Sequence, residues 1–440
     1  MRQDGSILVG LLWCLALLSV LVIGVLHTAR MDLLVVKNYG DRIQAHYLAL
    51  AGIEKARALL YHDGQDRSRS RKNHTGSLYD DASQFRDVPF GRGTFRIIRR
   101  GRPDEGGGII YGVSDEESRL NLNTASVDEL SRLQNLTPEV AAAIVNWRGG
   151  DSSTAAAEAQ YYAGLQPPYQ PRLGPFQTLR ELLMVRGVSP EDLLGRDRHL
   201  NGLLAAAEGN DFAFPGTVDG EDLGWAGNLT VASQVQNVNA AGEDRVNIQT
   251  ADENSLTALR GITRQIAHAV VTYRGQHQFQ SIADLLDVTP PANQSPSADP
   301  GDSSGGQPGN QVVSENLFLD LADNVTIDRG QSQAGLINVN TASLDVLVCL
   351  PGVSRELAQA IISHRASGGY FDNIGGLLKL PEMSRDVFKQ IAPLITARSE
   401  TYRILGEGRI NSTGARQRIE AIVHIGLNSQ QLLAWREDDL

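Results

Sequence analysis

The chain begins with an unbroken apolar stretch, and a different apolar pattern follows it. Residues 6–26 carry no charge. As a helix they would be about 31 Å long, which matches a bilayer core of about 30 Å. From residue 27 to Tyr61 no proline occurs and apolar residues recur at the 3-4 spacing of an amphipathic helix. We expect one long helix, with residues 6–26 in the membrane and residues 27–61 packed on a soluble domain; a plain anchor followed by a separate amphipathic helix is the alternative.

A cleaved secretory signal peptide fits this start less well than an anchor does. Its apolar region is usually about 7 to 15 residues long and is followed by small residues. Here the stretch is longer, and residues 26–30 read Leu-His-Thr-Ala-Arg. Lipoprotein processing is disfavoured as well, because Cys14 follows the bulky Trp13.

A polar segment and two pairs of strand-like segments flank the middle of the chain. Residues 62–77 predict a polar loop with a basic core; nucleic-acid or anionic-lipid binding is the alternative, but no aromatic residue interleaves with the charges. Residues 93–99 and 108–113 predict a β-hairpin, and residues 402–408 and 418–425 predict a second strand pair. Strands of one kind on both sides of a helical middle indicate one sheet interrupted by an insertion.

The middle contains three copies of an Asn-x-Asn/Gln-Thr-Ala sequence, at residues 121–125, 247–251 and 338–342. Each copy is followed by a short helical segment, a tight turn and a second helical segment, the pattern of a helix-hairpin-helix unit. A later segment with a Leu-Leu pair predicts a second hairpin in at least the first and third units. We therefore expect a large all-α insertion of helix-hairpin-helix, SAM-like repeats over residues 121–396.

The three hairpin turns lack the residues that phosphate binding needs. DNA-binding turns of this kind point backbone N–H groups at a phosphate, and a β-carbon at the second glycine would block the approach. The corresponding turn positions here, first and second glycine in each copy, are Asn135 and Thr137, Gly261 and Thr263, and Gly352 and Ser354. We interpret the repeats as a packing module rather than a DNA-recognition module.

Charge supports that interpretation. The 440-residue chain has a net charge of −11, and the body after residue 100 is acidic, whereas residues 1–100 are basic. An acidic body lacks the counterion release that drives most binding to nucleic acid. The two cysteines, Cys14 and Cys349, provide neither a disulfide framework nor a Cys-x-x-Cys metal site.

No strong catalytic motif accompanies these features. The chain contains no His-Glu-x-x-His, Gly-x-Ser-x-Gly, phosphate-loop or EF-hand pattern. Asp219, Glu221 and Asp222 are weak candidates for a Ca²⁺ site, with a solvated turn as the alternative, because their spacing defines no ligand set. We expect no catalytic residue and no cofactor beyond this calcium candidate, and therefore a non-enzymatic protein.

The amino terminus resembles that of type IV pilins and of the pseudopilins of type II secretion. A short polar leader, residues 1–5, ends in Gly5, and an apolar helix starts at Ser6. The resemblance implies cleavage by prepilin peptidase after Gly5 and N-methylation of Ser6. Most members carry Glu at the fifth mature position, where this chain has Gly10. A buried carboxylate needs a partner, so a subunit without one needs no amino-terminal neighbour beneath it; this indicates the tip and the K-type minor pseudopilins.

The insertion resembles the same family. Residues 161–169, 175–188 and 229–242 are similar to the inserted helical domain of K-type pseudopilins. The resemblance implies an α+β fold: a pilin-like long helix on an antiparallel sheet, with head segments at residues 62–120 and 397–440 around the insertion. Residues 290–311 are expected to form a disordered loop.

The resemblance also implies partners and a location. The partners would be I-type and J-type minor pseudopilins, the major pseudopilin, prepilin peptidase and the inner-membrane secretion platform, with no nucleic acid. The location would be the bacterial inner membrane, crossed once, with most of the chain in the periplasm and the protein capping or initiating the pseudopilus tip during export across the outer membrane. The alternative is a membrane-tethered, competence-type DNA receptor, which predicts salt-sensitive duplex binding that depends on Arg355 or Lys379.

Overall fold

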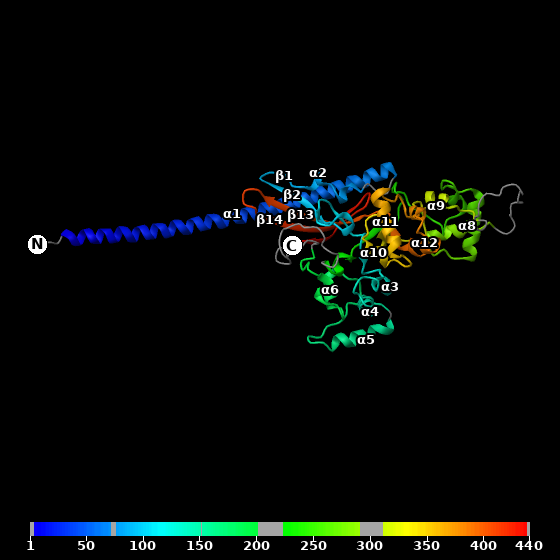
Figure 1. Ribbon diagram of the computed structural model, residues 1–440, viewed down its shortest axis with the longest axis horizontal. Coiled ribbons are helices and arrows are strands. Elements are labelled where there is room, and N and C mark those ends of the chain that lie inside the picture. The colour runs from blue at the N-terminus through cyan, green and yellow to red at the C-terminus, as the bar shows by residue number, and fades with distance from the viewer. Residues whose placement is uncertain (1–3, 72–75, 151, 201–222, 291–310, 438–440) are drawn as a thin grey trace.

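The fold combines a long amino-terminal helix, an antiparallel sheet and a large, mostly helical insertion (Figure 1). The computed structural model describes residues 4–71, 76–150, 152–200, 223–290 and 311–437. The predicted α+β class is confirmed. The later part of the insertion lies at the end of the head away from the amino terminus, whereas its first part, coloured cyan to green, projects to one side of the head (Figure 1).

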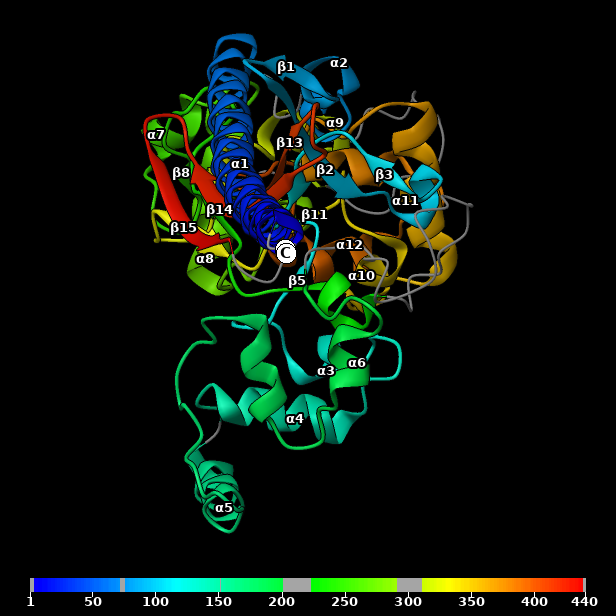
Figure 2. The same ribbon diagram turned by 90° about the vertical axis from the view of Figure 1, so that its left-hand side faces the viewer.

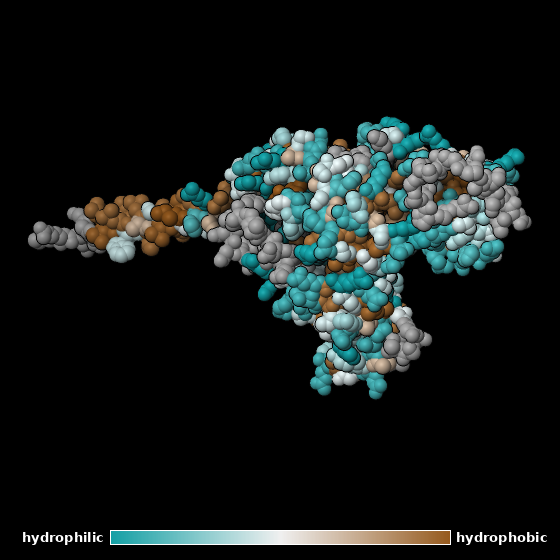
Figure 3. All heavy atoms as spheres, turned by 45° about the vertical axis from the view of Figure 1, so that its right-hand side comes forward, coloured by the Kyte–Doolittle hydropathy of each residue, from teal (hydrophilic) through white to brown (hydrophobic). Residues whose placement is uncertain are grey.

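Helix α1 (Asp4–Ser70) is continuous from the apolar stretch into the head. Its first part projects alone, and large apolar side chains between Leu8 and Val36 are exposed (Figure 3). From Asp41 onward one side of α1 is buried against the sheet. The expected single helix is therefore correct, and separate anchor and amphipathic helices are not observed in the described residues.

The predicted end of this helix at Tyr61 is wrong, and the predicted loop is wrong over residues 62–70, because α1 continues to Ser70. Residues 72–75 of the predicted loop lie outside the described part. Contacts with distant segments hold the extra turns. Gln65 donates to the carbonyl oxygen of Leu427 at 2.6 Å, and Ser68 donates to that of Ala241 at 2.8 Å. Tertiary contacts thus override the turn-like composition of this segment.

The main sheet is antiparallel and joins the two ends of the head. The strand order is β1 (Val88–Phe90), β2 (Gly93–Arg100), β13 (Thr401–Ile410), β14 (Arg416–Ile425) and β15 (Gln430–Arg436), with β3 (Ile109–Ile110) on β2 and β4 (Ser114–Asp115) on β13. Both predicted strand pairs are present. Because β2 pairs with β13, the expected single sheet interrupted by an insertion is confirmed.

Helix α1 lies on one face of this sheet (Figure 2). Ile53 of α1 packs with Ile97 of β2 and Ile404 of β13, and all three are completely buried. Close approach requires a glycine: a β-carbon on Gly408 would lie 2.0 Å from the carbonyl oxygen of Ala45. The sheet and α1 therefore form one core. A short helix, α2 (Ala82–Phe85), adds Phe85 to it.

The insertion contains three units of similar element order, in which the label η denotes a short 3₁₀-helix. The first has β5 (Leu120–Asn121), α3 (Val127–Leu130), α4 (Pro138–Trp147), α5 (Ser152–Ala163), η3 (Leu179–Met184), α6 (Pro190–Leu194), η5 (Trp225–Gly227) and β6 (Leu229–Thr230). The second has β8 (Val246–Asn247), α7 (Glu253–Thr257), α8 (Arg264–Gln276), η6 (Ile282–Asp287), α9 (Glu315–Leu321) and β9 (Val325–Thr326). The third has β11 (Ile337–Asn338), α10 (Leu344–Cys349), α11 (Arg355–Ser367), η7 (Ile374–Lys379), α12 (Arg385–Ile391), η8 (Ala392–Leu394) and β12 (Ile395–Thr396).

The insertion is not purely helical, which corrects the all-α expectation. A two-residue parallel pair closes each unit: β5 with β6, β8 with β9, and β11 with β12. The strands β7 (Gln234–Gln236) and β10 (Ser332–Ala334) form an antiparallel pair between units. Two-residue strands carry no alternating pattern, so periodicity could not reveal them. A second hairpin is present in all three units; in the second unit η6 and α9 form it, on either side of residues 291–310.

Candidate assembly surfaces and the junction of head and insertion

The amino-terminal part of α1 is the first candidate surface. One helix in the described residues is long and apolar enough to cross a membrane, and no residue of its most apolar stretch is buried. It fits a single-pass anchor. Gly5 and Ser6 lie within α1. The cleavage after Gly5 and the methylation of Ser6 stay predictions. Gly10 also lies in α1, and a β-carbon there would meet no other atom within 4 Å.

The Asn-x-Asn/Gln-Thr-Ala sequences share one hydrogen-bonded geometry. In each unit the first Asn accepts the backbone N–H two residues later, at 2.8, 2.9 and 3.0 Å for Asn121, Asn247 and Asn338. The third residue accepts the backbone N–H of a distant Phe: Asn123 from Phe176, Gln249 from Phe279 and Asn340 from Phe371. The repeated sequence therefore anchors the start of each second hairpin.

An arginine completes each unit, and its role was not predicted. An arginine at or near the end of the second helical segment donates to two carbonyls of the starting turn. Arg148 donates to Leu122 and Ala125, Arg274 to Ile248 and Ala251, and Arg365 to Val339 and Ala342. The arginine follows the alanine by 23 residues in every unit. This constant spacing was the signal in the sequence.

The residues at the two glycine positions of each hairpin turn have defined structural roles. Asn135, Gly261 and Gly352 all have positive φ, at 62°, 87° and 72°, so the first glycine position keeps a left-handed conformation. Thr137, Thr263 and Ser354 cap the following helices by accepting the N–H groups of Val140, Ile266 and Leu357. A hydroxyl of the protein thus satisfies an N–H group that would otherwise be open to an anion. This geometry agrees with packing rather than phosphate binding.

The turns also face neighbouring helices. A β-carbon on Gly261 would lie 2.6 Å from the Leu317 side chain of α9, and one on Gly352 would lie 3.2 Å from Val387 of α12. In the first unit, the indole of Trp225 donates to the carbonyl oxygen of Gln134 at 3.0 Å. Each first hairpin therefore packs within its own unit through its turn.

Three consecutive acids join the head to the insertion: Asp115, Glu116 and Glu117, each no more than 4% exposed. Asp115 accepts hydrogen bonds from Thr341, Ser399 and the Asn338 amide. All three donors lie in the third unit or the chain that follows it. The carboxylate therefore ties the end of β4 to both borders of that unit.

Glu116 and Glu117 make the other connections between head and insertion. Their surroundings shift the pKa values of the two carboxyl groups in opposite directions. Glu116 contacts Arg119 and Arg403, each at 2.8 Å. Burial acts to raise the pKa of Glu116, but these arginines lower it below its usual value. Glu117 accepts the backbone N–H groups of Gln234 and Thr401. Burial and the neighbouring Asp115 raise its pKa well above the usual value.

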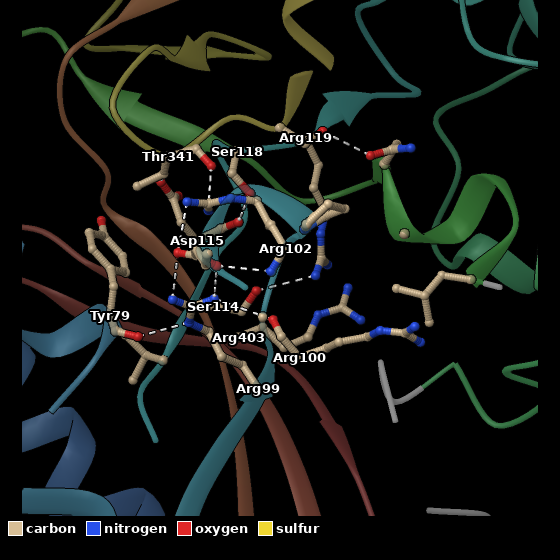
Figure 4. Close-up of a pocket in the computed structure, with 18 of the residues that line it drawn as sticks. Tyr79, Arg99, Arg100, Arg102, Ser114, Asp115, Ser118, Arg119, Thr341 and Arg403 are labelled. Atoms are coloured by element: carbon tan, nitrogen blue, oxygen red, sulfur yellow. Dashed lines mark hydrogen bonds and ion pairs between the residues drawn. The ribbon is translucent and has the colours of Figure 1, made fainter. Parts of the chain in front are cut away.

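A cavity of about 140 Å³ lies at this junction (Figure 4). It is lined by four arginines: Arg99 of β2, Arg102 of the β2–β3 loop, Arg119 of the segment after β4, and Arg403 of β13. Acids pair with all four: Glu105 with Arg99 and Arg102, and Glu116 with Arg119 and Arg403. The arginines therefore connect the walls of the cavity.

The β2–β3 loop also reaches the third unit directly. Arg102 donates to the carbonyl oxygen of Thr341 at 2.6 Å, and Asp104 pairs with Arg365 at 2.8 Å. Burial acts to raise the pKa of Glu105, but Arg99 and Arg102 lower it to about 2. The head and the third unit are thus held together by several charged contacts.

The calcium candidates Asp219, Glu221 and Asp222 lie outside the described residues. Among the residues that are described, no group of three His, Cys, Asp or Glu side chains is placed to hold a metal ion. Residues 291–310, most of the predicted loop, also lie outside the described part.

Comparison with known proteins gives two family matches. Residues 113–197 match the model for "Type II secretion system (T2SS), protein K", and residues 242–290 and 332–396 match the model for the "Helix-hairpin-helix motif". The first match includes the three buried acids and the first unit as far as α6. The second match covers the first part of the second unit and the whole third unit, where the sequence predicted hairpins.

Curated relatives match only part of the chain. Endonuclease/exonuclease/phosphatase family domain-containing protein 1 is 30% identical over 155 residues in Xenopus laevis (34% of this chain, 26% of that protein) and 26% identical over 174 residues in Rattus norvegicus (37% and 29%). The chain thus spans less than a third of these relatives. An uncharacterized protein of Neisseria meningitidis is 39% identical over 56 residues (13% and 7%).

A solved structure resembles the chain at low identity: the crystal structure of the GspK-GspI-GspJ complex from the enterotoxigenic Escherichia coli type 2 secretion system. The TM-score is 0.45 and the identity is 12%, covering 91% of this chain and 98% of the other. The protein K match, by contrast, is made on sequence and runs from β4, at the end of the first head segment, into the first unit of the insertion. This match makes residues 113–197 similar to protein K of the type II secretion system, within a chain whose long helix packs on an antiparallel sheet.

Proposed function

We propose that the chain is a non-enzymatic assembly subunit that caps or initiates the periplasmic pseudopilus and thereby supports export across the outer membrane. The observation that carries this proposal is the protein K match at residues 113–197, inserted into a head whose own helix continues as an exposed apolar rod. The chain would cross the inner membrane once, with head and insertion in the periplasm.

Two physical features favour the tip. A glycine at position 10 leaves no carboxylate in the apolar part of α1 that would require a neighbour's terminal amine. The second and third units of the insertion occupy the end of the head opposite the anchor, while the first unit projects to one side (Figure 1). A pilin-like subunit added above would meet the insertion rather than another head. Both features suit a subunit with neighbours below and beside it.

The proposed partners are the I-type and J-type minor pseudopilins and, below them, the major pseudopilin. Prepilin peptidase and the inner-membrane platform would act earlier, during processing and assembly. We expect no nucleic-acid partner, because the hairpin turns are capped by their own hydroxyl groups and pack within their units. A Ca²⁺ ion near Asp219, Glu221 and Asp222 remains a proposal that metal analysis of the purified protein would test.

The experiment is mass spectrometry of the chain purified from membranes, together with co-purification. A mature chain that begins at methylated Ser6 and brings I-type and J-type subunits with it would support the proposal. An intact Met1 end, or a processed chain that binds neither subunit, would contradict it. A variant with Gly5→Val provides the control, because it should block processing without changing the periplasmic head.

A further inference from the structure

Strand β15 is an edge strand with an unusual surface. Six of its seven residues are exposed, and Leu432, Leu433 and Trp435 are 49%, 39% and 38% exposed. It pairs with β14 on one side only, and within the described chain no backbone hydrogen bond reaches its other side. A long edge strand with exposed apolar residues and no charge before its last residue invites pairing with another strand.

The opposite edge of the sheet is different. Strand β1 has three residues, and one of them is Pro89, which cannot donate a backbone hydrogen bond. Short edge strands and proline are common ways of preventing unwanted pairing. In β15 neither device is present, and no charged residue precedes Arg436 at its end. Among the residues that the structure describes, the contrast within one sheet indicates that the β15 edge is suited to a partner strand.

Strand β15 runs beside α1 toward the membrane. Gln430 at its start accepts from Arg57 at 3.4 Å, and Glu437 just after its end lies 3.7 Å from His46. In Figure 2 β15 forms the outer border of the sheet next to α1. Leu432 and Trp435 pair in register with Val423 and Ala421, which belong to the core beneath α1. Their side chains therefore lie on the helix side of the sheet.

Helix α1 also exposes apolar residues close to His46. Tyr47 packs edge-on against His46 and is 62% exposed, and Ile43, one turn closer to the membrane, is 42% exposed. Exposed apolar residues then continue along α1 to the anchor. A partner that approached along this part of α1 would cover both these apolar residues and the β15 edge.

We infer that β15 receives the edge strand of another membrane-anchored, pilin-like subunit, which extends the sheet across the subunit boundary. The inference rests on the proposed function. A subunit anchored in the same membrane would bring its helix beside α1 and its own sheet beside β15 at one time. Backbone hydrogen bonds would supply the pairing, and Leu432, Leu433 and Trp435 would supply the apolar contact.

The test uses the full-length chain in detergent with the purified periplasmic heads of the I-type and J-type subunits of the same secretion system. Amide hydrogen exchange is followed in residues 430–436, with and without each head. Partner affinity is measured for Leu433→Lys, which places a charge on the edge at the point where the strand register shifts. Phe90→Lys is the matched control, because Phe90 is 61% exposed on the opposite edge.

If β15 is the docking edge, one of the heads slows exchange in residues 430–436 at least about tenfold, and Leu433→Lys weakens its binding by about tenfold or more while Phe90→Lys does not. Binding of both heads with unchanged β15 exchange and unchanged affinity of Leu433→Lys overturns the inference but leaves the proposed function intact. Failure of both heads to bind wild type contradicts both. If amide exchange in residues 430–436 slows in the chain alone as the chain's concentration rises, the edge binds a second copy of the chain. That result overturns the stated partner.

Discussion

Arg365 donates through Nη1 to the carbonyl oxygen of Ala342 at 2.7 Å, across 23 residues of the third unit. The same side chain also pairs with Asp104 of the β2–β3 loop. One arginine thus closes a helix-hairpin-helix unit and joins it to the head. Arg148 and Arg274 close the other two units in the same way. The insertion therefore repeats one structural element three times.

Replacing Arg365 should destabilise the chain strongly. Arg365→Ala leaves the carbonyls of Val339 and Ala342 and the Asp104 carboxylate without this donor, so we expect a loss of about 3 kcal/mol in the free energy of unfolding. Urea denaturation followed by circular dichroism measures it. Arg355→Ala is the control, since Arg355 is exposed on the same helix and should change stability by about 0.5 kcal/mol or less. Equal effects of the two variants would contradict the assigned role.

The approach of α1 to the sheet depends on glycine at one position. In Gly408→Ala the new β-carbon would lie 2.0 Å from the Ala45 carbonyl oxygen, so helix and sheet must separate, and we expect a loss of about 2 kcal/mol or more. Gly40→Ala, also a single methyl, meets no atom within 4 Å and should stabilise the helix by a few tenths to about 1 kcal/mol. Thermal unfolding of both variants is the measurement. A neutral Gly408→Ala would show that the close contact is not required.

The junction should weaken in acid. The pKa of Glu105 is lowered to about 2 in the folded chain, so its contribution is present above its unfolded value and is lost as the pH falls toward 2. Between pH 6 and pH 3 this carboxylate alone should account for about 2 kcal/mol of lost stability. Urea unfolding at several pH values in wild type and Glu105→Gln tests it. The variant should be less stable at pH 6 and show a shallower decline; parallel curves would contradict the prediction.

The sequence pattern was enough to predict the long helix, both strand pairs, the interrupted sheet and the hairpin units, because each has a local periodicity or a repeated motif. The end of α1 was missed because Gln65 and Ser68 are fixed by residues far away in the chain. The junction around Asp115 and the pairing of the two-residue strands were missed for the same reason. Strand β15 was not predicted as a separate strand. Both of its faces are exposed, so apolar and polar residues do not alternate along it.

DNA binding provides a test of the packing interpretation. The hairpin turns are capped by Thr137, Thr263 and Ser354, so we expect no retardation of duplex DNA by the purified chain at low salt. Gel retardation over a range of salt concentrations measures it. Salt-sensitive retardation that disappears in Arg355→Ala or Lys379→Ala would instead support the DNA-receptor alternative.

Position in the pseudopilus tests the central claim most directly. Antibody raised against the insertion, residues 121–396, would be used to label pseudopili by immunogold electron microscopy. A tip subunit predicts one label at a single end of each filament and none along its length. Labels at regular intervals along the filament, or filaments of normal number and length in a strain that lacks the chain, would contradict the account.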